Sequence, residues 1–170
     1  IGPQRLKKII QYLSKRDKRV KSVQIQFSLL SPDLPKQLNV KRICENNNID
    51  FLAYSPLCFG ILCIDPEKDE DKQNSFLRSL IFKNYKKSTT ELRRCLKKIA
   101  VSRSVSQAQV AINWCCYQGA IPLVGMRKKS QVIDISNVFK WNLNQKEFGM
   151  LQEASQKCLK KMPSNPLSSI

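Results

Sequence analysis

The residues with the clearest chemical meaning form a short basic segment, Gly125-Met126-Arg127-Lys128. This segment follows the apolar stretch 120–124, a predicted short strand, and leads into a predicted helix. A glycine after a strand lets a ligand approach the backbone closely, and a helix N-terminus offers free N–H groups to an anion. Arg127 adds a bidentate donor for a phosphate, and Lys128 adds a point charge. The sequence therefore predicts a phosphate-binding site in this segment.

Two further side chains of interest, Gln24 and Tyr54, lie on predicted strands. Gln24 belongs to the stretch 23–28, in which polar and apolar residues alternate as in a strand with one face in the core. Tyr54 ends the stretch 49–54, which is more continuously apolar and is typical of a strand covered on both faces. Each side chain either contacts a ligand or packs within the sheet, and the pattern alone leaves both interpretations open.

The composition limits the chemistry that this chain performs by itself. Its 170 residues include no histidine, which is the commonest general acid and base in enzymes. Its seven cysteines form no C-x-x-C pair, and a zinc site usually needs clustered cysteines or cysteines with histidines. We therefore expect no metal site, and we expect the cysteines to be reduced, buried thiols of an intracellular protein.

The chain is strongly basic, with a formal net charge of +17 and a pI near 9.8. Such a charge attracts nucleic acids, acidic membranes and phosphorylated ligands. The basic residues are spread along the whole chain, however, and no aromatic platform is interleaved with them. We therefore expect a solvated basic surface rather than a specific nucleic-acid site. No apolar run approaches the ~18 residues that a membrane span requires.

Apolar periodicity predicts helices before, between and after the strands. These helices cover or begin at residues 3–19, 37–46, 89, 106, 127 and 144. Ser106 with Gln109, and Asn144 with Glu147, have the spacing of helix N-terminal caps. The charged stretch 65–74 has no periodicity, and we expect a mobile loop there. Strands that alternate with helices predict an α/β fold with a parallel sheet. Three aromatic residues are expected in the core: Trp114, Phe139 and Trp141.

Five groups of residues occur in a defined order: 24–30, 53–57, 108–114, 119–122, and Gln131 with 141–143 and Glu147. Their order and spacing over residues 2–151 resemble the second half of the aldo-keto reductases, especially the branch with plant-type reductases and potassium-channel β subunits. The resemblance implies that the chain is the C-terminal half of a (β/α)8 barrel, whose ligands bind at the carboxyl ends of the strands. We expect a partial barrel domain over residues 1–162 and a frayed tail over 163–170.

The resemblance also implies that NADP(H) lies extended across this half of the barrel. In the family, the residue matching Gln24 hydrogen-bonds the nicotinamide carboxamide, and the residue matching Tyr54 stacks on the nicotinamide ring. The other matching positions are Ser55, Pro56, Leu57 and Gly60 at the pyrophosphate, Arg78 at the phosphates, and Gly125, Arg127, Lys128 and Gln131 at the adenosine end.

Some positions depart from the family's pattern. Asp134 stands in place of the usual glutamate near the adenine, and Ile135 in place of an asparagine, which predicts weaker adenine recognition. Ile64 and Asp65 replace a Gly-Lys pair after the loop that wraps the pyrophosphate. The carboxylate of Asp65 is therefore expected near the path of the cofactor's phosphates.

The function implied by the resemblance is NADP(H)-dependent reduction of carbonyls or aldehydes. The family's proton donor is a tyrosine, helped by a lysine, an aspartate and usually a histidine, and these residues lie in the first half of the barrel. We therefore assign no catalytic residue to this chain, which begins at Ile1 and which we expect to be preceded by further sequence. The alternative function is a non-catalytic NADP(H)-binding regulatory module. A basic nucleic-acid or anionic-membrane binder is a third hypothesis.

The expected partners are the nicotinamide cofactor, a small carbonyl substrate and the missing N-terminal half of the barrel. Three strands do not close a barrel, and open strand edges invite association, so we also expect the isolated chain to self-associate. Because the sequence shows no targeting signal, we expect the protein in the cytoplasm.

Overall fold

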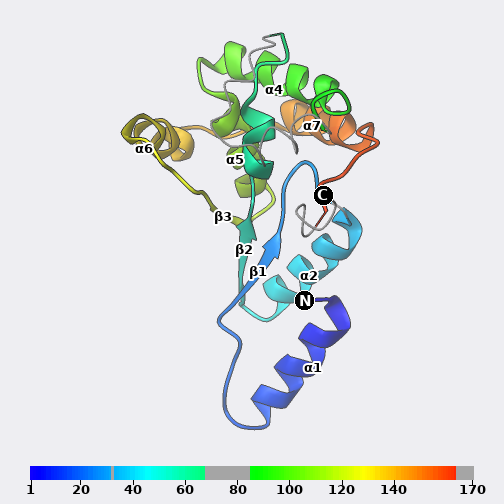
Figure 1. The fold of residues 1–170 in the computed structure, drawn as a ribbon. Coiled ribbons are helices and arrows are strands. Elements are labelled where there is room, and N and C mark those ends of the chain that lie inside the picture. The colour runs from blue at the N-terminus through cyan, green and yellow to red at the C-terminus, as the bar shows by residue number, and fades with distance from the viewer. Residues whose placement is uncertain (32, 68–84, 164–170) are drawn as a thin grey trace.

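The sheet at the centre of the molecule has three parallel strands. The computed structural model describes residues 1–31, 33–67 and 85–163 (Figure 1). In this part of the chain, β1 (Ser22–Gln26), β2 (Asp50–Tyr54) and β3 (Ile121–Leu123) are hydrogen-bonded in the order β1-β2-β3. Both strand pairs are parallel, so the predicted α/β fold with a parallel sheet is confirmed.

The helices lie before, between and after these strands. Their bounds are α1 (Pro3–Ser14), α2 (Leu34–Asn46), η1 (Cys58–Cys63), α4 (Thr90–Arg103), α5 (Gln107–Tyr117), α6 (Lys129–Ser136), η2 (Asn137–Lys140) and α7 (Gln145–Gln156). Helix α1 packs against α2, and α4 packs against both α5 and α7. Figure 1 shows α6 lying apart from the group that α4, α5 and α7 form.

Two helix boundaries differ from the predicted ones by three residues or more, and each of these differences has a local cause. Helix α2 begins at residue 34 instead of 37, because the side chain of Asp33 accepts a hydrogen bond from the N–H of Lys36 at 3.2 Å. Pro35 is tolerated in this first turn, where its missing N–H has no partner to lose. Helix α1 ends at residue 14 instead of 19, and the chain then turns at Asp17, whose φ is 53°.

The two predicted caps behave differently. Asn144 and Glu147 form a complete capping box, because each side chain accepts a hydrogen bond from the other residue's N–H at 2.9 Å. Ser106 caps α5 by accepting a hydrogen bond from the N–H of Gln109 at 3.1 Å. The carboxamide of Gln109 does not return this contact but donates to Asp134. The second cap is therefore only half of the predicted box.

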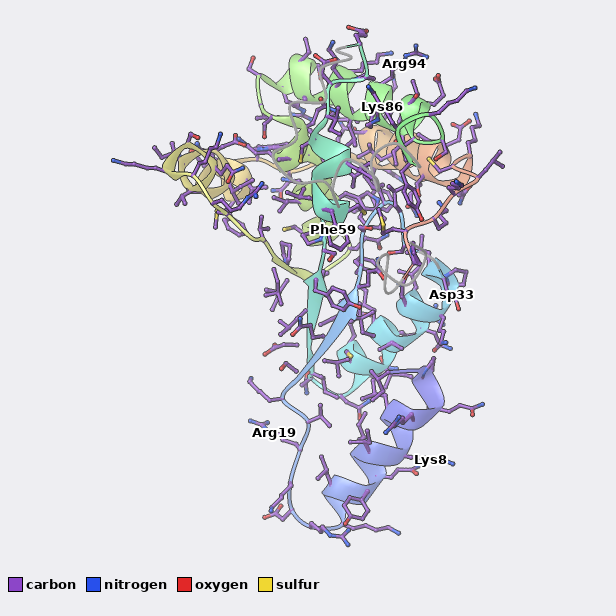
Figure 2. All side chains as sticks on the ribbon, in the orientation of Figure 1. Lys8, Arg19, Asp33, Phe59, Lys86 and Arg94 are labelled. Carbon is purple, nitrogen blue, oxygen red and sulfur yellow. The ribbon has the colours of Figure 1, made fainter. Side chains whose placement is uncertain are left out.

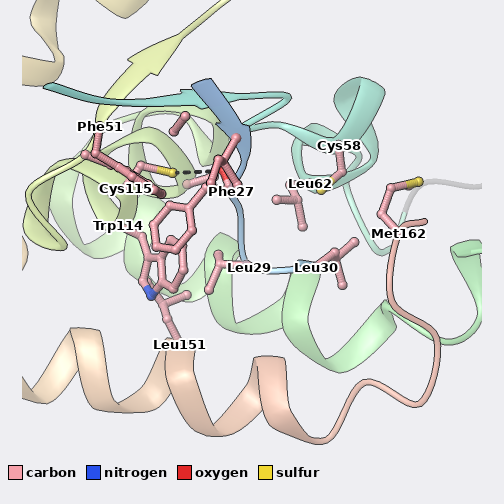
Figure 3. Packing of buried hydrophobic residues seen from close by; sticks show 14 of the residues in the cluster. Phe27, Leu29, Leu30, Phe51, Cys58, Leu62, Trp114, Cys115, Leu151 and Met162 are labelled. Carbon is pink, nitrogen blue, oxygen red and sulfur yellow. Dashed lines mark hydrogen bonds between the residues drawn. The ribbon is translucent and has the colours of Figure 1, made fainter. Parts of the chain in front are cut away.

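Aromatic side chains from β2, from the residue after β1 and from α5 form the centre of the core (Figure 3). The ring of Phe27 stacks on Trp114 with a centroid distance of 5.2 Å and meets Phe51 edge-on at 5.3 Å. Trp114 is fully buried, as predicted, and the indole N–H of the half-buried Trp141 donates to Gln109. The expectation that Phe139 lies in the core is wrong, because its side chain is 77% exposed on η2.

The two faces of the sheet have different environments. The face toward the helices buries Val23, Ile25, Phe51 and Ala53. The opposite face shows two rows of register partners: Gln24, Leu52 and Ile121, then Gln26, Tyr54 and Leu123. On this second face the β2 residues Leu52 and Tyr54 are half-buried, so in the described chain residues 49–54 are fully covered on one side and only partly covered on the other. Within the described residues, β1 and β3 each also keep one unpaired edge.

None of the seven cysteines, all of which the structure describes, forms a disulfide, and four of them are buried. Burial raises the pKa of Cys58 to about 12, although its thiol lies 3.0 Å from the hydroxyl of Ser28. Cys63, in contrast, is exposed. Among the described residues we find no helix long and apolar enough to cross a bilayer, and no cluster of three or more metal-ligating side chains.

Candidate functional site

A groove with a volume of about 730 Å³ lies between the loop after β2 and the segment after β3. These strands are neighbours in the sheet and run in the same direction, so the loops that follow them meet at its carboxyl edge. The groove brings together most of the site residues predicted from the sequence: Ser55, Pro56, Leu57, Gly60, Gly125, Arg127, Lys128 and Gln131. Phe59, Cys63, Ile64, Leu123, Val124 and Met126 complete its lining.

The loop after β2 is built from unusual backbone conformations. Ser55, Cys58, Phe59 and Gly60 all have positive φ angles, between 49° and 95°. Such angles are strained for residues other than glycine, and they persist where surrounding contacts hold them. Here the N–H of Cys58 donates to the carbonyl of Ser55 at 3.0 Å, and the N–H of Gly60 donates to that of Leu57 at 2.9 Å. The tight turns place the side chain of Phe59 at the surface, 40% exposed (Figure 2).

The opposite wall of the groove presents two cations whose backbone is held by a nearby side chain. The carboxamide oxygen of Gln131 accepts hydrogen bonds from the N–H groups of Arg127, at 2.8 Å, and Lys128, at 3.1 Å. The side chains of both basic residues are exposed. Gln131 thus satisfies the two N–H groups that precede α6, and the exposed guanidinium and ammonium can bind an anion.

Gln24 and Tyr54 lie beside this groove but do not line it. Both project from the open face of the sheet, where Gln24 is paired in register with Leu52. Tyr54 directly precedes Ser55, and its partner in β3 is Leu123, which does line the groove. The groove and the open face therefore meet at the Tyr54–Leu123 pair. Arg78, the remaining predicted contact, lies outside the described residues, as do residues 68–74 of the charged loop and 164–170 of the tail.

Gln26 is a residue at this face that the sequence analysis did not single out. Its side chain is 3% exposed, and its Nε2 donates weakly to the carbonyls of Met162, at 3.4 Å, and Pro163, at 3.3 Å. The N–H of Met162 in turn donates to Leu30 at 2.8 Å, so the segment after α7 is fastened across the carboxyl end of β1. The alternation in β1 placed Gln26 on the same face as Gln24, but no local signal revealed its distant partners.

Asp65, Asp134 and Ile135, which depart from the family's pattern, each have defined surroundings in the structure. The carboxylate of Asp65 pairs with Lys97 at 3.0 Å, and the ammonium of Lys97 also pairs with Glu67 at 2.5 Å. A cation from α4 thus balances the negative charge expected near the groove. Asp134 is directed at α5, and Ile135 lines an apolar hollow of about 510 Å³ that adjoins the groove and shares residues 123–126 with it.

Comparisons with known proteins give a consistent result. The model of the aldo/keto reductase family matches residues 2–156. The chloroplastic pyridoxal reductase of Arabidopsis thaliana is 36% identical over 164 residues, which are 96% of this chain and 44% of that protein. A Schizosaccharomyces pombe protein named as an NADP(+) aldo-keto reductase is 23% identical over 146 residues, covering 79% of this chain and 42% of its own.

A solved structure shows the same fold. The glycerol dehydrogenase of Gluconobacter oxydans superposes with a TM-score of 0.67 at 24% sequence identity, over 85% of this chain and 45% of that one. The chain therefore spans less than half the length of each of these relatives.

Proposed function

Because this chain belongs to the aldo/keto reductase family, we propose that it supplies the NADP(H)-binding part of an oxidoreductase that reduces a small aldehyde or ketone. The observation that supports this proposal best is the groove of about 730 Å³, in which Arg127 and Lys128 lie across from the loop 55–60. A strained backbone loop on one wall and two cations on the other suit a ligand with several phosphates.

The residues present fit such a cofactor in a defined direction. We infer that the pyrophosphate lies against the loop 55–60 and that Arg127 and Lys128 bind the 2′-phosphate, which selects NADP(H) over NAD(H). The nicotinamide end then lies over the open face of the sheet, near Tyr54 and Gln24. The cofactor supplies a hydride to the carbonyl carbon, while the chain binds and orients it.

The proton donor belongs, in this proposal, to sequence outside these 170 residues. The chain has no histidine, and Tyr12, Tyr85 and Tyr117 match no catalytic motif of the family. Reduction by a longer product of the same coding sequence, with no turnover by this chain alone, is the expected result. Binding of NADPH without turnover by the longer product as well would instead favour a non-catalytic regulatory module.

The relative with 36% identity suggests the first substrate to test. That protein is named a pyridoxal reductase, and the similarity covers 96% of this chain. We therefore propose pyridoxal, an aromatic aldehyde, as the first carbonyl compound for assays of the longer product. Its name also places the relative in chloroplasts, so localising a fluorescent fusion of the full coding sequence will test our prediction of the cytoplasm.

The open face of the sheet suggests a protein partner. Ile121 and Leu123 are 48% and 39% exposed there, next to the unpaired edge of β3. We propose that the missing half of the barrel covers this face and that, in its absence, a second copy of the chain does so. Light scattering that returned a stable monomer at micromolar concentration would contradict self-association.

The binding proposal is tested by titrating the chain with NADPH and, separately, with NADH, while following nicotinamide fluorescence. We expect saturable binding of NADPH and weaker binding of NADH, because NADH lacks the 2′-phosphate. Steeply salt-dependent RNA binding without any response to NADPH would favour the nucleic-acid hypothesis instead.

A further inference from the structure

Helix α6 follows the two cations of the groove directly, yet little apolar burial holds it in place. None of its eight residues is buried, and its apolar side chains Val132 and Ile133 are 50% and 57% exposed. The ribbon also runs apart from the other helices that surround the site (Figure 1). Another interaction must therefore fix this helix and, with it, the wall formed by Arg127 and Lys128.

Asp134 provides that interaction through both of its carboxylate oxygens. Its Oδ1 accepts a hydrogen bond from Nε2 of Gln109 at 2.6 Å, and its Oδ2 accepts one from the hydroxyl of Ser106 at 2.7 Å. Ser106 is the N-cap of α5, and Gln109 lies in the first turn of that helix. In the described part of the chain, these are the side-chain hydrogen bonds that join α6 to α5. Hydrogen bonds to a charged acceptor are stronger than those between neutral groups.

The surroundings of Asp134 determine the direction of each of these hydrogen bonds. The indole N–H of Trp141 donates to Oε1 of Gln109 at 3.1 Å, which turns the amide group of Gln109 toward Asp134. The N–H of Gln109 donates to the hydroxyl of Ser106, which leaves the hydroxyl proton for Asp134. Two donors therefore face position 134, and a carboxylate offers one oxygen to each of them.

We propose that Asp134 is a positioning residue of the groove: it tethers α6 to α5 and so holds Arg127 and Lys128 opposite the loop 55–60. This inference deepens the proposed function and rests on it. Asp134 acts on the two cations through Gln131, which lies on the same helix and accepts hydrogen bonds from the N–H groups of Arg127 and Lys128. Both carboxylate oxygens of Asp134 bond to α5, and Asp134 is not among the residues that line the groove.

The test compares Asp134→Ala with two other variants of α6. Ser136→Ala is the matched control, because among the described residues the hydroxyl of Ser136 bonds within its own helix, to the carbonyl of Ile133 at 2.8 Å. Asp134→Asn is the conservative variant, since its amide oxygen can accept from Gln109 while its NH₂ group donates to Ser106. Each variant is assayed for amide hydrogen exchange of residues 127–136 and for the Kd of NADPH.

Asp134→Ala is expected to speed exchange across residues 127–136 about tenfold and to raise the Kd for NADPH by a similar factor, with exchange in β2 unchanged. Ser136→Ala should alter neither quantity, and Asp134→Asn should recover part of both, because it keeps two hydrogen bonds but loses the charge. Unchanged exchange in Asp134→Ala would overturn the tether, and faster exchange with an unchanged Kd would overturn the positioning role. Failure of the parent chain to bind NADPH would instead overturn the proposed function, while the exchange data would still decide the tether.

Discussion

The guanidinium of Arg103 forms two hydrogen bonds to the carboxylate of Glu147, from Nε to Oε1 at 2.7 Å and from Nη2 to Oε2 at 2.8 Å. The pair joins the end of α4 to the first turn of α7, in which Glu147 also accepts from the N–H of Asn144. The pKa of Glu147 is lowered chiefly by the hydrogen bond from Arg103. One carboxylate thus contributes both to the packing of two helices and to the start of one of them.

This pair predicts a specific dependence of stability on pH. The folded-state pKa of Glu147 is lowered. Its carboxylate therefore contributes fully to the free energy of unfolding above the ordinary glutamate pKa of about 4.3, and this contribution is lost as pH falls through the lower folded-state pKa. Glu147→Gln should therefore lower the free energy of unfolding at pH 7, and the difference from the parent should shrink below about pH 4. Urea denaturation at several pH values measures this change. A difference that stays constant down to pH 3 would contradict the assigned role.

Two phenylalanines provide a matched test of where the core lies. Phe27 is fully buried against Trp114, whereas Phe139 is 77% exposed. Phe27→Ala should lower the free energy of unfolding by about 3–5 kcal/mol, because it leaves a cavity in the core. Phe139→Ala should change it by less than about 0.5 kcal/mol. Thermal and urea denaturation of both variants measure these values, and equal losses would show that the core is wrongly placed.

The cysteines should differ sharply in their reactivity toward a maleimide. Cys63 is exposed and lines the groove, whereas burial raises the pKa of Cys58 to about 12 and keeps its thiol protonated at neutral pH. In the folded chain at pH 7.5, Cys63 should be labelled at least about tenfold faster than Cys58, and NADPH should slow the labelling of Cys63. Mass spectrometry of peptides identifies the labelled residues. Protection by NADPH at Cys95, on α4, in place of Cys63 would place the cofactor elsewhere.

The sequence predicted the elements that depend on local periodicity and the chemistry that depends on one short segment. Alternation in residues 23–28 located β1, and the glycine and two basic residues after 120–124 located one wall of the groove. Both signals are local, because a side chain's face in a strand follows from its position and a loop follows the strand that carries it.

The sequence did not reveal side-chain partners that lie far along the chain. Gln26 bonds to carbonyls more than 130 residues away, and Asp134 bonds to the start of a different helix. Such contacts depend on where distant segments pack, and the apolar periodicity of one segment does not predict which other segment packs against it. Phe139 was misplaced for a related reason, because apolar character alone does not show whether a neighbouring element covers the residue.

The central claim, that the groove binds the phosphates of NADP(H) through Arg127, is tested most directly by the Kd of NADPH for the parent chain and for Arg127→Ala. Lys146→Ala is the control, because it removes an exposed cation from α7, outside the groove, and lowers the net charge equally. We predict that Arg127→Ala raises the Kd at least about tenfold, as the loss of a charge-assisted hydrogen bond implies, and that Lys146→Ala leaves it within about twofold. Equal Kd values for the parent chain and Arg127→Ala would contradict the claim.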